Sequence, residues 1–164
     1  MSSSCILYGF FIYNIVHMKT MIIVWGASYR GKSQGIKALA EAMPFSSVIK
    51  PWEESAYDSY VIGNVKDDQG KERLVGIESL GDPNSTQVNK IDECVKAGCE
   101  IIVAASRSYG TTWNDANRIA KANGYNVIQV TTIFCEGGPE LSNGVDLRSV
   151  FAENMVSLVK KCLQ

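Results

Sequence analysis

Eight consecutive residues near the start of the chain have the types and spacing needed to hold a phosphate group. They read Gly26-Ala27-Ser28-Tyr29-Arg30-Gly31-Lys32-Ser33, a complete G-x-x-x-x-G-K-S pattern. The two glycines allow a positive φ and a close approach of the backbone to a ligand. Successive N–H groups of such a loop form a concave anion-binding nest, to which the lysine adds a positive charge. The pattern therefore predicts a phosphate-binding loop.

The segments on either side of the loop are those that this chemistry requires. Residues 21–25 (MIIVW) form a continuous apolar run, which is typical of a strand buried on both faces. Residues 33–43 carry apolar side chains at helical spacing, and Pro44 follows their end. Such a helix directs the positive end of its dipole toward a bound phosphate. The order strand, loop, helix is the context that the motif needs.

With this context, the chain resembles the P-loop NTPase superfamily. The resemblance rests on the Walker A sequence GASYRGKS and, more loosely, on the alternation of strands and helices. It implies binding of ATP or GTP together with Mg²⁺, and ATP is the default because the sequence leaves the base open. Beyond the loop, the chain looks like small single-domain P-loop proteins of phage and mobile elements.

The resemblance implies a set of nine nucleotide-binding residues. Within it, Lys32 would reach the β- and γ-phosphates as a catalytic residue, and the Ser33 hydroxyl would hold Mg²⁺. Tyr29 or Trp113 is a candidate for stacking on the base, although core packing suits Trp113 better. The nine residues are Gly26, Ala27, Ser28, Tyr29, Arg30, Gly31, Lys32, Ser33 and Gln34.

Two acidic residues are candidates for the metal side of the site, where P-loop proteins usually place an acid. Glu78 directly ends a predicted strand, and Asp82 follows in a glycine-containing turn. Each also has a structural alternative. Glu78 can be a solvated strand end, and Asp82 before Pro83 can be the N-cap of a helix. Both are predicted metal ligands, and Glu78 is also predicted to be catalytic.

Arg107 is the third predicted catalytic residue, because it follows a buried-type strand at residues 100–105. Ligands of open α/β sheets bind beyond the carboxyl ends of the strands. Its guanidinium could bind the γ-phosphate or the phosphate of a second substrate. The alternative is a surface arginine paired with a carboxylate. Residues 89–92 spell the guanine-reading N-K-x-D, but they lie inside a predicted helix, so we interpret them as a coincidence.

The alternation of strand and helix patterns predicts an α/β fold, with a three-layer, mostly parallel sheet and one β-hairpin. The turn-rich residues 66–71 form the hairpin, and Thr112 and Asp115 have the spacing of a capping box. Strands are expected at 21–25, 48–52, 60–65, 73–78, 100–105 and 126–134, and helices at 33–43, 83–97, 112–123 and 146–163.

Residues 18–164 are predicted to form a single nucleotide-binding domain that follows an extension of residues 1–17. The extension contains an apolar run at residues 5–16, which is shorter than the roughly 20 residues that span a bilayer. No basic residue precedes this run, so it does not resemble a signal peptide. We interpret the extension as preceding a true start at Met18 or Met21, or as an added edge strand or partner-binding arm.

The composition of the 164 residues excludes several classes of protein. Apolar residues make up 46% and charged residues 20%, which excludes a disordered chain. A net charge of −1 gives no clear signal for nucleic acid or membrane binding. The five cysteines lack CxxC spacing, and His17 is the single histidine. These residues argue against a disulfide framework and fit a cytoplasmic location.

The sequence therefore predicts Mg²⁺-dependent binding of a nucleoside triphosphate, with hydrolysis or phosphoryl transfer. A small kinase, with a small-molecule or protein second substrate, is one form of this activity. An oligomeric hydrolase activated by an arginine of another subunit is a second form. The alternative function is a nucleotide-binding regulatory or interaction module with little turnover. Five dispersed arginines and the lack of a long insert argue against the arginine-rich lid of nucleotide kinases.

Overall fold

The computed structural model describes residues 18–54 and 59–164, so the predictions for residues 1–17 lie outside the described residues. The described chain is an α/β structure with six strands and four helices. In chain order these are β1 (Thr20–Trp25), α1 (Lys32–Ala42), β2 (Phe45–Glu54), β3 (Ser59–Lys66), β4 (Glu72–Glu78), α2 (Gln87–Ala97), β5 (Ile101–Ser106), α3 (Thr111–Ala122), β6 (Asn126–Thr131) and α4 (Leu147–Cys162).

The strands form one mixed, mostly parallel sheet in the order β2-β3-β4-β5-β1-β6. The pairs β4–β5, β5–β1 and β1–β6 are parallel, whereas β2–β3 and β3–β4 are antiparallel. The predicted hairpin joins β3 to β4. In the parallel register, Trp25 at the end of β1 is level with Ser106 of β5 and Thr131 of β6. The segments that follow these three strands therefore start at the same edge of the sheet.

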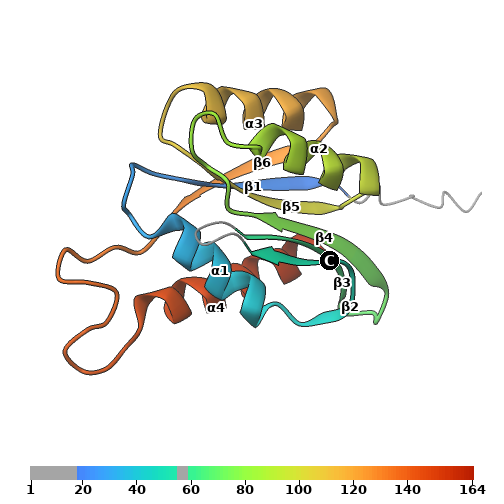
Figure 1. Ribbon diagram of the computed structural model, residues 1–164. Helices are drawn as coiled ribbons and strands as arrows, with labels where there is room; N and C mark the ends of the chain where they lie inside the picture. The colour runs from blue at the N-terminus through green and yellow to red at the C-terminus, as the bar shows by residue number, and fades with distance from the viewer. Residues whose placement is uncertain (1–17, 55–58) are drawn as a thin grey trace, which may run out of the picture.

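Helices cover both faces of the sheet, which gives the predicted three layers (Figure 1). Helices α1 and α4 pack on one face, and α2 and α3 lie on the other. The side chains of β1 alternate between these two cores. Ile22 and Val24 enter the core between the sheet and helices α1 and α4. Met21 and Ile23 enter the core between the sheet and helices α2 and α3. This burial on both faces explains why β1 reads as a continuous apolar run.

Two strands differ in length from the prediction, whereas seven of the ten elements begin and end within one residue of it. Strand β2 spans ten residues where 48–52 was expected, and register irregularities interrupt its pairing with β3. Strand β6 ends at Thr131, although the apolar pattern continues to Phe134. The residues after Thr131 line a cleft, described below, and this explains their apolar character.

Helix α2 begins at Gln87, so the predicted start at residue 83 is wrong, and Asp82 is not its N-cap. Residues 82–85 form a turn in which the Ser85 N–H donates to the Asp82 carbonyl oxygen at 3.1 Å. Asn84 in this turn has a left-handed φ of 63°, which interrupts a helical path. The prediction of a cap failed because an Asp-Pro pair suits a turn as well as a helix start.

The capping box predicted at α3 is also wrong. The residue before the helix is Gly110, and no side chain caps the helix there. The Thr112 hydroxyl instead accepts a hydrogen bond from the Arg107 N–H at 3.2 Å, and Asp115 forms an ion pair with Arg118. The threonine thus holds the loop after β5 rather than the helix terminus.

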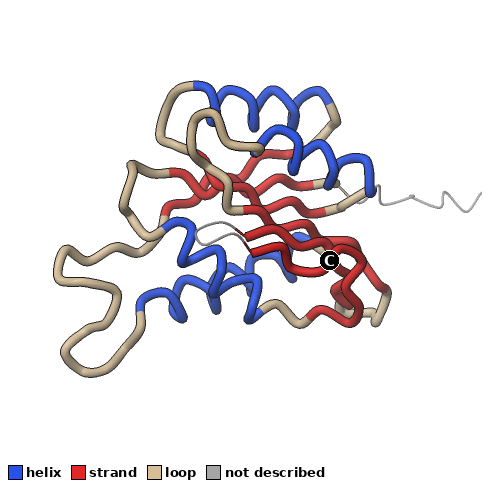
Figure 2. Tube along the Cα trace, viewed as in Figure 1, coloured by secondary structure: helices blue, strands red, loops and turns tan. Residues whose placement is uncertain are grey.

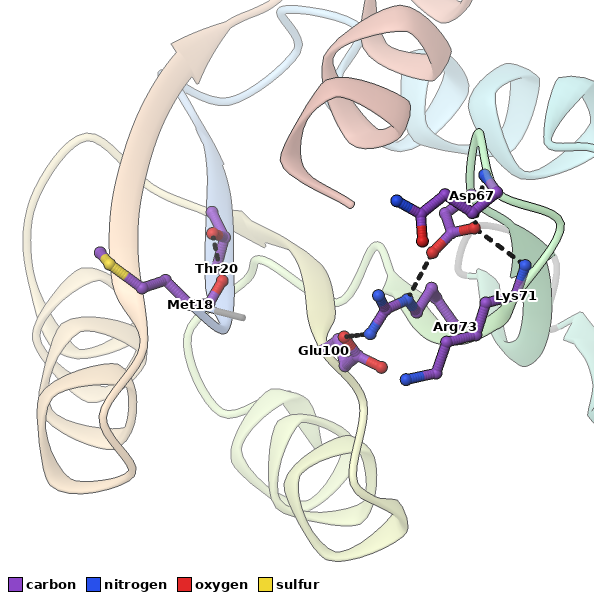
Figure 3. A network of polar contacts seen from close by, with 7 residues as sticks. Met18, Thr20, Asp67, Lys71, Arg73 and Glu100 are labelled. Atoms are coloured by element: carbon purple, nitrogen blue, oxygen red, sulfur yellow. Dashed lines mark hydrogen bonds and ion pairs between the residues drawn. The ribbon is translucent and has the colours of Figure 1, made fainter. Parts of the chain in front are cut away.

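An ion-pair network holds the amino-terminal ends of β4 and β5, at the edge of the sheet opposite the cleft (Figure 3). The Arg73 guanidinium donates to Asp67 at 2.9 Å and to Glu100 at 3.0 Å. Asp67 also accepts the backbone N–H groups of Gln69 and Lys71, which shapes the hairpin turn. The network therefore links the hairpin to the start of β5.

We predict that this network makes folding sensitive to acid through Asp67. The hydrogen bond from Arg73, with those from the turn, lowers the pKa of Asp67 below its ordinary value. Its stabilising effect is therefore complete above the unfolded pKa of about 4 and is lost as pH falls through the lower folded value. In thermal unfolding, Asp67→Asn should be less stable than wild type at pH 7, and the difference should shrink below about pH 4.

The matched control is Asp68→Asn, which removes another carboxylate from the same turn. The Asp68 carboxylate contacts Gln164 rather than Arg73. This variant should leave the pH profile of unfolding close to that of wild type. A stability difference between wild type and Asp67→Asn that is constant from pH 2 to pH 7 would contradict the assignment.

Candidate functional site

A cleft of about 1180 Å³ collects most of the predicted site residues at the carboxyl edge of the sheet. Its wall includes seven of the nine predicted nucleotide-binding residues, namely Ser28, Tyr29, Arg30, Gly31, Lys32, Ser33 and Gln34. Asp82 and Arg107 also line it, and residues between β6 and α4 complete it. Figure 2 shows the loops that follow β1 and β6 at the same end of the molecule. Gly26, Ala27 and Glu78 lie outside the lining.

The loop between β1 and α1 has a backbone conformation that most residues avoid. Gly31 has a φ of 73°, which its lack of a side chain permits. Tyr29 has a φ of 59°, which is strained for a residue with a Cβ, and the residue is 98% exposed. Side-chain packing therefore does not account for the strain. Backbone strain of this kind persists where neighbouring contacts impose it, and it is concentrated at functional sites.

Lys32 is the first residue of α1, and its side chain folds back across the loop. Its Nζ donates to the carbonyl oxygens of Gly26 at 2.8 Å and Ala27 at 2.6 Å. The residue is only 8% exposed. Burial lowers the pKa of Lys32, and the positive charge of Arg107 lowers it further, while Asp82 opposes this effect. The arrangement holds a buried ammonium that an anion in the cleft would stabilise.

Arg107 and Asp82 form an ion pair at the same cleft. The Asp82 Oδ1 atom accepts from Arg107 Nε at 3.0 Å and lies 2.9 Å from Arg107 Nη2. The structure thus places Arg107 beyond the end of β5, as predicted, and also pairs it with a carboxylate. The Asp82 side chain is 76% exposed, and exposed pairs contribute about 0–1 kcal/mol. Such a pair can exchange for a phosphate ligand at small cost.

Glu78 is fully buried, so the alternative of a solvated strand end is wrong. Its Oε2 accepts the Leu80 N–H at 2.7 Å, and its Oε1 accepts the Ala105 N–H at 3.0 Å. The carboxylate therefore fastens the segment after β4 to the end of β5. Strand β5 also separates β4 from β1. Of the two acids, Asp82 is the one that faces the cleft, and the catalytic and metal roles of Glu78 stay predictions.

Gly81 is a residue whose importance the sequence did not reveal. A Cβ on Gly81 would lie 2.8 Å from the Ala105 Cβ and 2.9 Å from the Ser106 N atom. Only glycine therefore lets the segment that carries Asp82 approach the end of β5 so closely. A pattern of Gly before Asp-Pro indicates a turn, but the sequence does not say which strand that turn contacts.

The cleft is also lined by residues between β6 and α4, which were not predicted as site residues from the sequence. The Thr132 hydroxyl donates to the Arg30 carbonyl oxygen at 2.7 Å. The Arg30 guanidinium lies over the Phe134 ring, 4.3 Å from its centroid. Arg148 and Asp146, at the start of α4, form a further ion pair in the wall. The apolar residues after β6 read as the end of a strand, so no local signal marked them.

Trp113 packs in the core, as the sequence analysis favoured. Its ring meets Trp25 edge to face with centroids 6.4 Å apart, and it packs against the core under α2 and α3. The residues that spell N-K-x-D lie within α2, where Lys90 stands over the Tyr60 ring. This placement supports reading the motif as a coincidence.

Three comparisons with known proteins complete the description of the site. No family model, no curated protein and no solved structure matches the chain. None of the helices within residues 18–54 and 59–164 combines the length and the apolar composition that spanning a bilayer requires. The same residues contain no group of three or more His, Cys, Asp or Glu side chains that could hold a metal ion. Assignment of a function therefore depends on the geometry of the cleft.

We predict that the two acids differ in how much they contribute to stability. In Glu78→Gln, the amide keeps one acceptor oxygen, so one of the two backbone N–H groups, of Leu80 or Ala105, loses its partner. This loss should lower the free energy of unfolding by about 1–3 kcal/mol. Asp82→Asn, the matched control, changes an exposed side chain and should stay within about 0.5 kcal/mol of wild type. Chemical denaturation measures both free energies of unfolding. If Glu78→Gln is as stable as wild type, the structural role assigned to the Glu78 carboxylate is contradicted.

Proposed function

We propose that the protein is a P-loop protein that binds a nucleoside triphosphate, ATP by default, together with Mg²⁺, and that hydrolyses it or transfers its γ-phosphoryl group. The single observation that carries the proposal is the environment of Lys32. It occupies the first turn of α1, its ammonium is buried, and its two acceptors are neutral carbonyl oxygens of the loop. A polyphosphate is the kind of ligand that would compensate this charge.

The positive groups of the cleft support the binding of phosphates. Lys32 would exchange its bonds to the loop carbonyls for bonds to phosphate oxygens. Arg107 would release Asp82 and bind the terminal phosphate through its forked N–H groups. During phosphoryl transfer, both side chains would stabilise the negative charge on the transferred group.

The residues present also fit magnesium. Mg²⁺ prefers oxygen ligands and often uses only one or two protein carboxylates besides substrate phosphates. The Ser33 hydroxyl and the Asp82 carboxylate line the same cleft and are the groups that would hold it. When bound, Mg²⁺ supplies neutralisation of the charge on the phosphates. This donor set agrees with the small number of acidic groups at the cleft.

A regulatory or interaction module with little turnover is the second candidate, because the carboxylates of Glu78 and Asp82 are both engaged in contacts within the protein. Both carboxylate oxygens of Glu78 accept backbone N–H groups, so they are engaged in structure. Asp82 is paired with Arg107. Neither acid is placed to accept a proton from an attacking water while these bonds last. Formation of ADP from Mg²⁺-ATP, followed over time, separates binding with turnover from binding alone, because hydrolysis and phosphoryl transfer both release ADP.

We predict that Lys32→Ala weakens binding of Mg²⁺-ATP at least tenfold, because a hydrogen bond to a charged group contributes about 1.5–3 kcal/mol. Isothermal titration calorimetry measures the affinity. Lys37→Ala is the matched control, because it removes another lysine of the same cleft and should change the affinity less. Equal affinities of wild type and Lys32→Ala would remove the proposed function.

The lowered pKa of Lys32 predicts a pH dependence of binding. Phosphates prefer the protonated amine, so affinity should be constant at neutral pH. It should fall as pH rises through the lowered pKa, before the ordinary lysine value of 10.5 is reached. Titrations from neutral pH to above the ordinary lysine value locate this loss. Lys32→Arg keeps its positive charge throughout this range. Its affinity for Mg²⁺-ATP should therefore not fall with rising pH as that of wild type does. A wild-type affinity that falls only at the ordinary lysine value would contradict the assignment.

A further inference from the structure

The cleft has two chemically different halves. The inner half, beside α1 and β5, holds the charged groups of Lys32, Arg107 and Asp82. The outer half is formed by the segment between β6 and α4, where Ile133 and Phe134 are 44% and 43% exposed and which ends at the Asp146–Arg148 ion pair. Figure 1 shows this segment as a long loop on the same side of the molecule as the loop that precedes α1. An anionic ligand with an apolar, planar end would match both halves.

Phe134 is held beside the phosphate-binding half by two contacts. The Arg30 guanidinium covers one face of its ring at 4.3 Å. The hydrogen bond from Thr132 to the Arg30 carbonyl oxygen fixes the start of the same segment to the loop. The ring is therefore positioned before a ligand arrives, which reduces the entropy lost on binding. Its remaining exposed surface is open to a further planar group.

The other aromatic residues near the cleft are less suitable. Trp113 is engaged with Trp25 in the core, as described above. Tyr29 lines the cleft, but the residue is 98% exposed, which leaves little of it packed against the protein. Tyr109 is also highly exposed and lies outside the cleft lining. Phe151 also lines the cleft, but it is only 5% exposed because it packs in the core under α1 and α4. Phe134 is therefore the lining ring that is held by a neighbour and still has surface open to a ligand.

We propose that Phe134 is the base-stacking residue of the site, with Arg30 as the residue that positions its ring. This inference rests on the proposed function, because it assigns the nucleoside end of the same ligand. The base stacks on the Phe134 ring in the outer half while the phosphates reach Lys32 in the inner half. The cleft volume of about 1180 Å³ exceeds the roughly 300–1,000 Å³ of ordinary small-molecule sites, so it has room for both ends.

The test compares Mg²⁺-ATP and Mg²⁺-GTP with Mg²⁺-tripolyphosphate, which has the phosphates without a base. Calorimetric titration of the full chain gives the affinity for each. Phe134→Ala should weaken both nucleotides about tenfold and leave tripolyphosphate unchanged, because base–aromatic stacking depends on the ring. Phe134→Trp should preserve nucleotide binding, and Phe134→Leu should behave like the alanine variant. Tyr109→Ala is the matched control and should affect none of the ligands.

Each alternative result has a distinct meaning. If Phe134→Ala weakens tripolyphosphate and nucleotides equally, or weakens neither, Phe134 does not stack on the base. If wild type binds tripolyphosphate as tightly as the nucleotides, the inference is overturned while the phosphate-binding loop stands. If wild type binds none of the three ligands, the proposed function fails, and this inference fails with it. Melting temperatures of all variants check that this exposed position leaves the fold intact.

Discussion

The buried ammonium of Lys32 is the constraint around which the carboxyl edge of the sheet is organised. An ammonium removed from water is unfavourable unless strong acceptors surround it, and two neutral carbonyl oxygens offset only part of that loss. The loop must bend so that the carbonyls of Gly26 and Ala27 reach the Nζ atom. The left-handed conformations of Tyr29 and Gly31 lie in this bend. Strain in the backbone and burial of charge thus occur together in one short segment, which is where a ligand would have the largest stabilising effect.

The sheet provides the rigid support that this loop needs. Strand β1 is paired on both sides, with β5 and β6, and its side chains are buried in both cores. Because the three strands are parallel and in register, the segments that follow them converge on one cleft. The loop after β1 brings the lysine, the loop after β5 brings the arginine, and the loop after β6 brings the aromatic ring. The antiparallel strands β2 and β3 extend the sheet away from this point.

Much of this fold could be predicted because its signals are local. The apolar run of β1 and the glycine-lysine motif lie within one short stretch of sequence, and the amphipathic pattern of α4 needs no knowledge of its neighbours. The site residues that were misjudged depend on contacts between distant segments. Glu78 reads as a strand end, but its role is set by Ala105, 27 positions away. In the sequence, Phe134 looks like a continuation of β6, but in the structure its ring lies against the guanidinium of Arg30. Asp82 reads as a cap, and only the turn over residues 82–85 shows that α2 starts later.

The two acids illustrate how burial divides similar side chains between structure and function. Glu78 is fully buried, and both of its oxygens accept backbone N–H groups, so moving it would leave two donors without partners. Asp82 is mostly exposed, and water can replace Arg107 as its partner at small cost. A ligand that enters the cleft therefore meets Asp82, which can move, whereas Glu78 lies outside the cleft lining and cannot move without breaking both of its backbone hydrogen bonds. Gly81 connects them, and its close approach to Ala105 anchors the turn that carries Asp82 to the same strand end that Glu78 holds. The hydrogen bonds of Glu78 thus hold the segment after β4 against the end of β5, and this places Asp82 within reach of Arg107. The exposed ion pair therefore depends on the buried carboxylate.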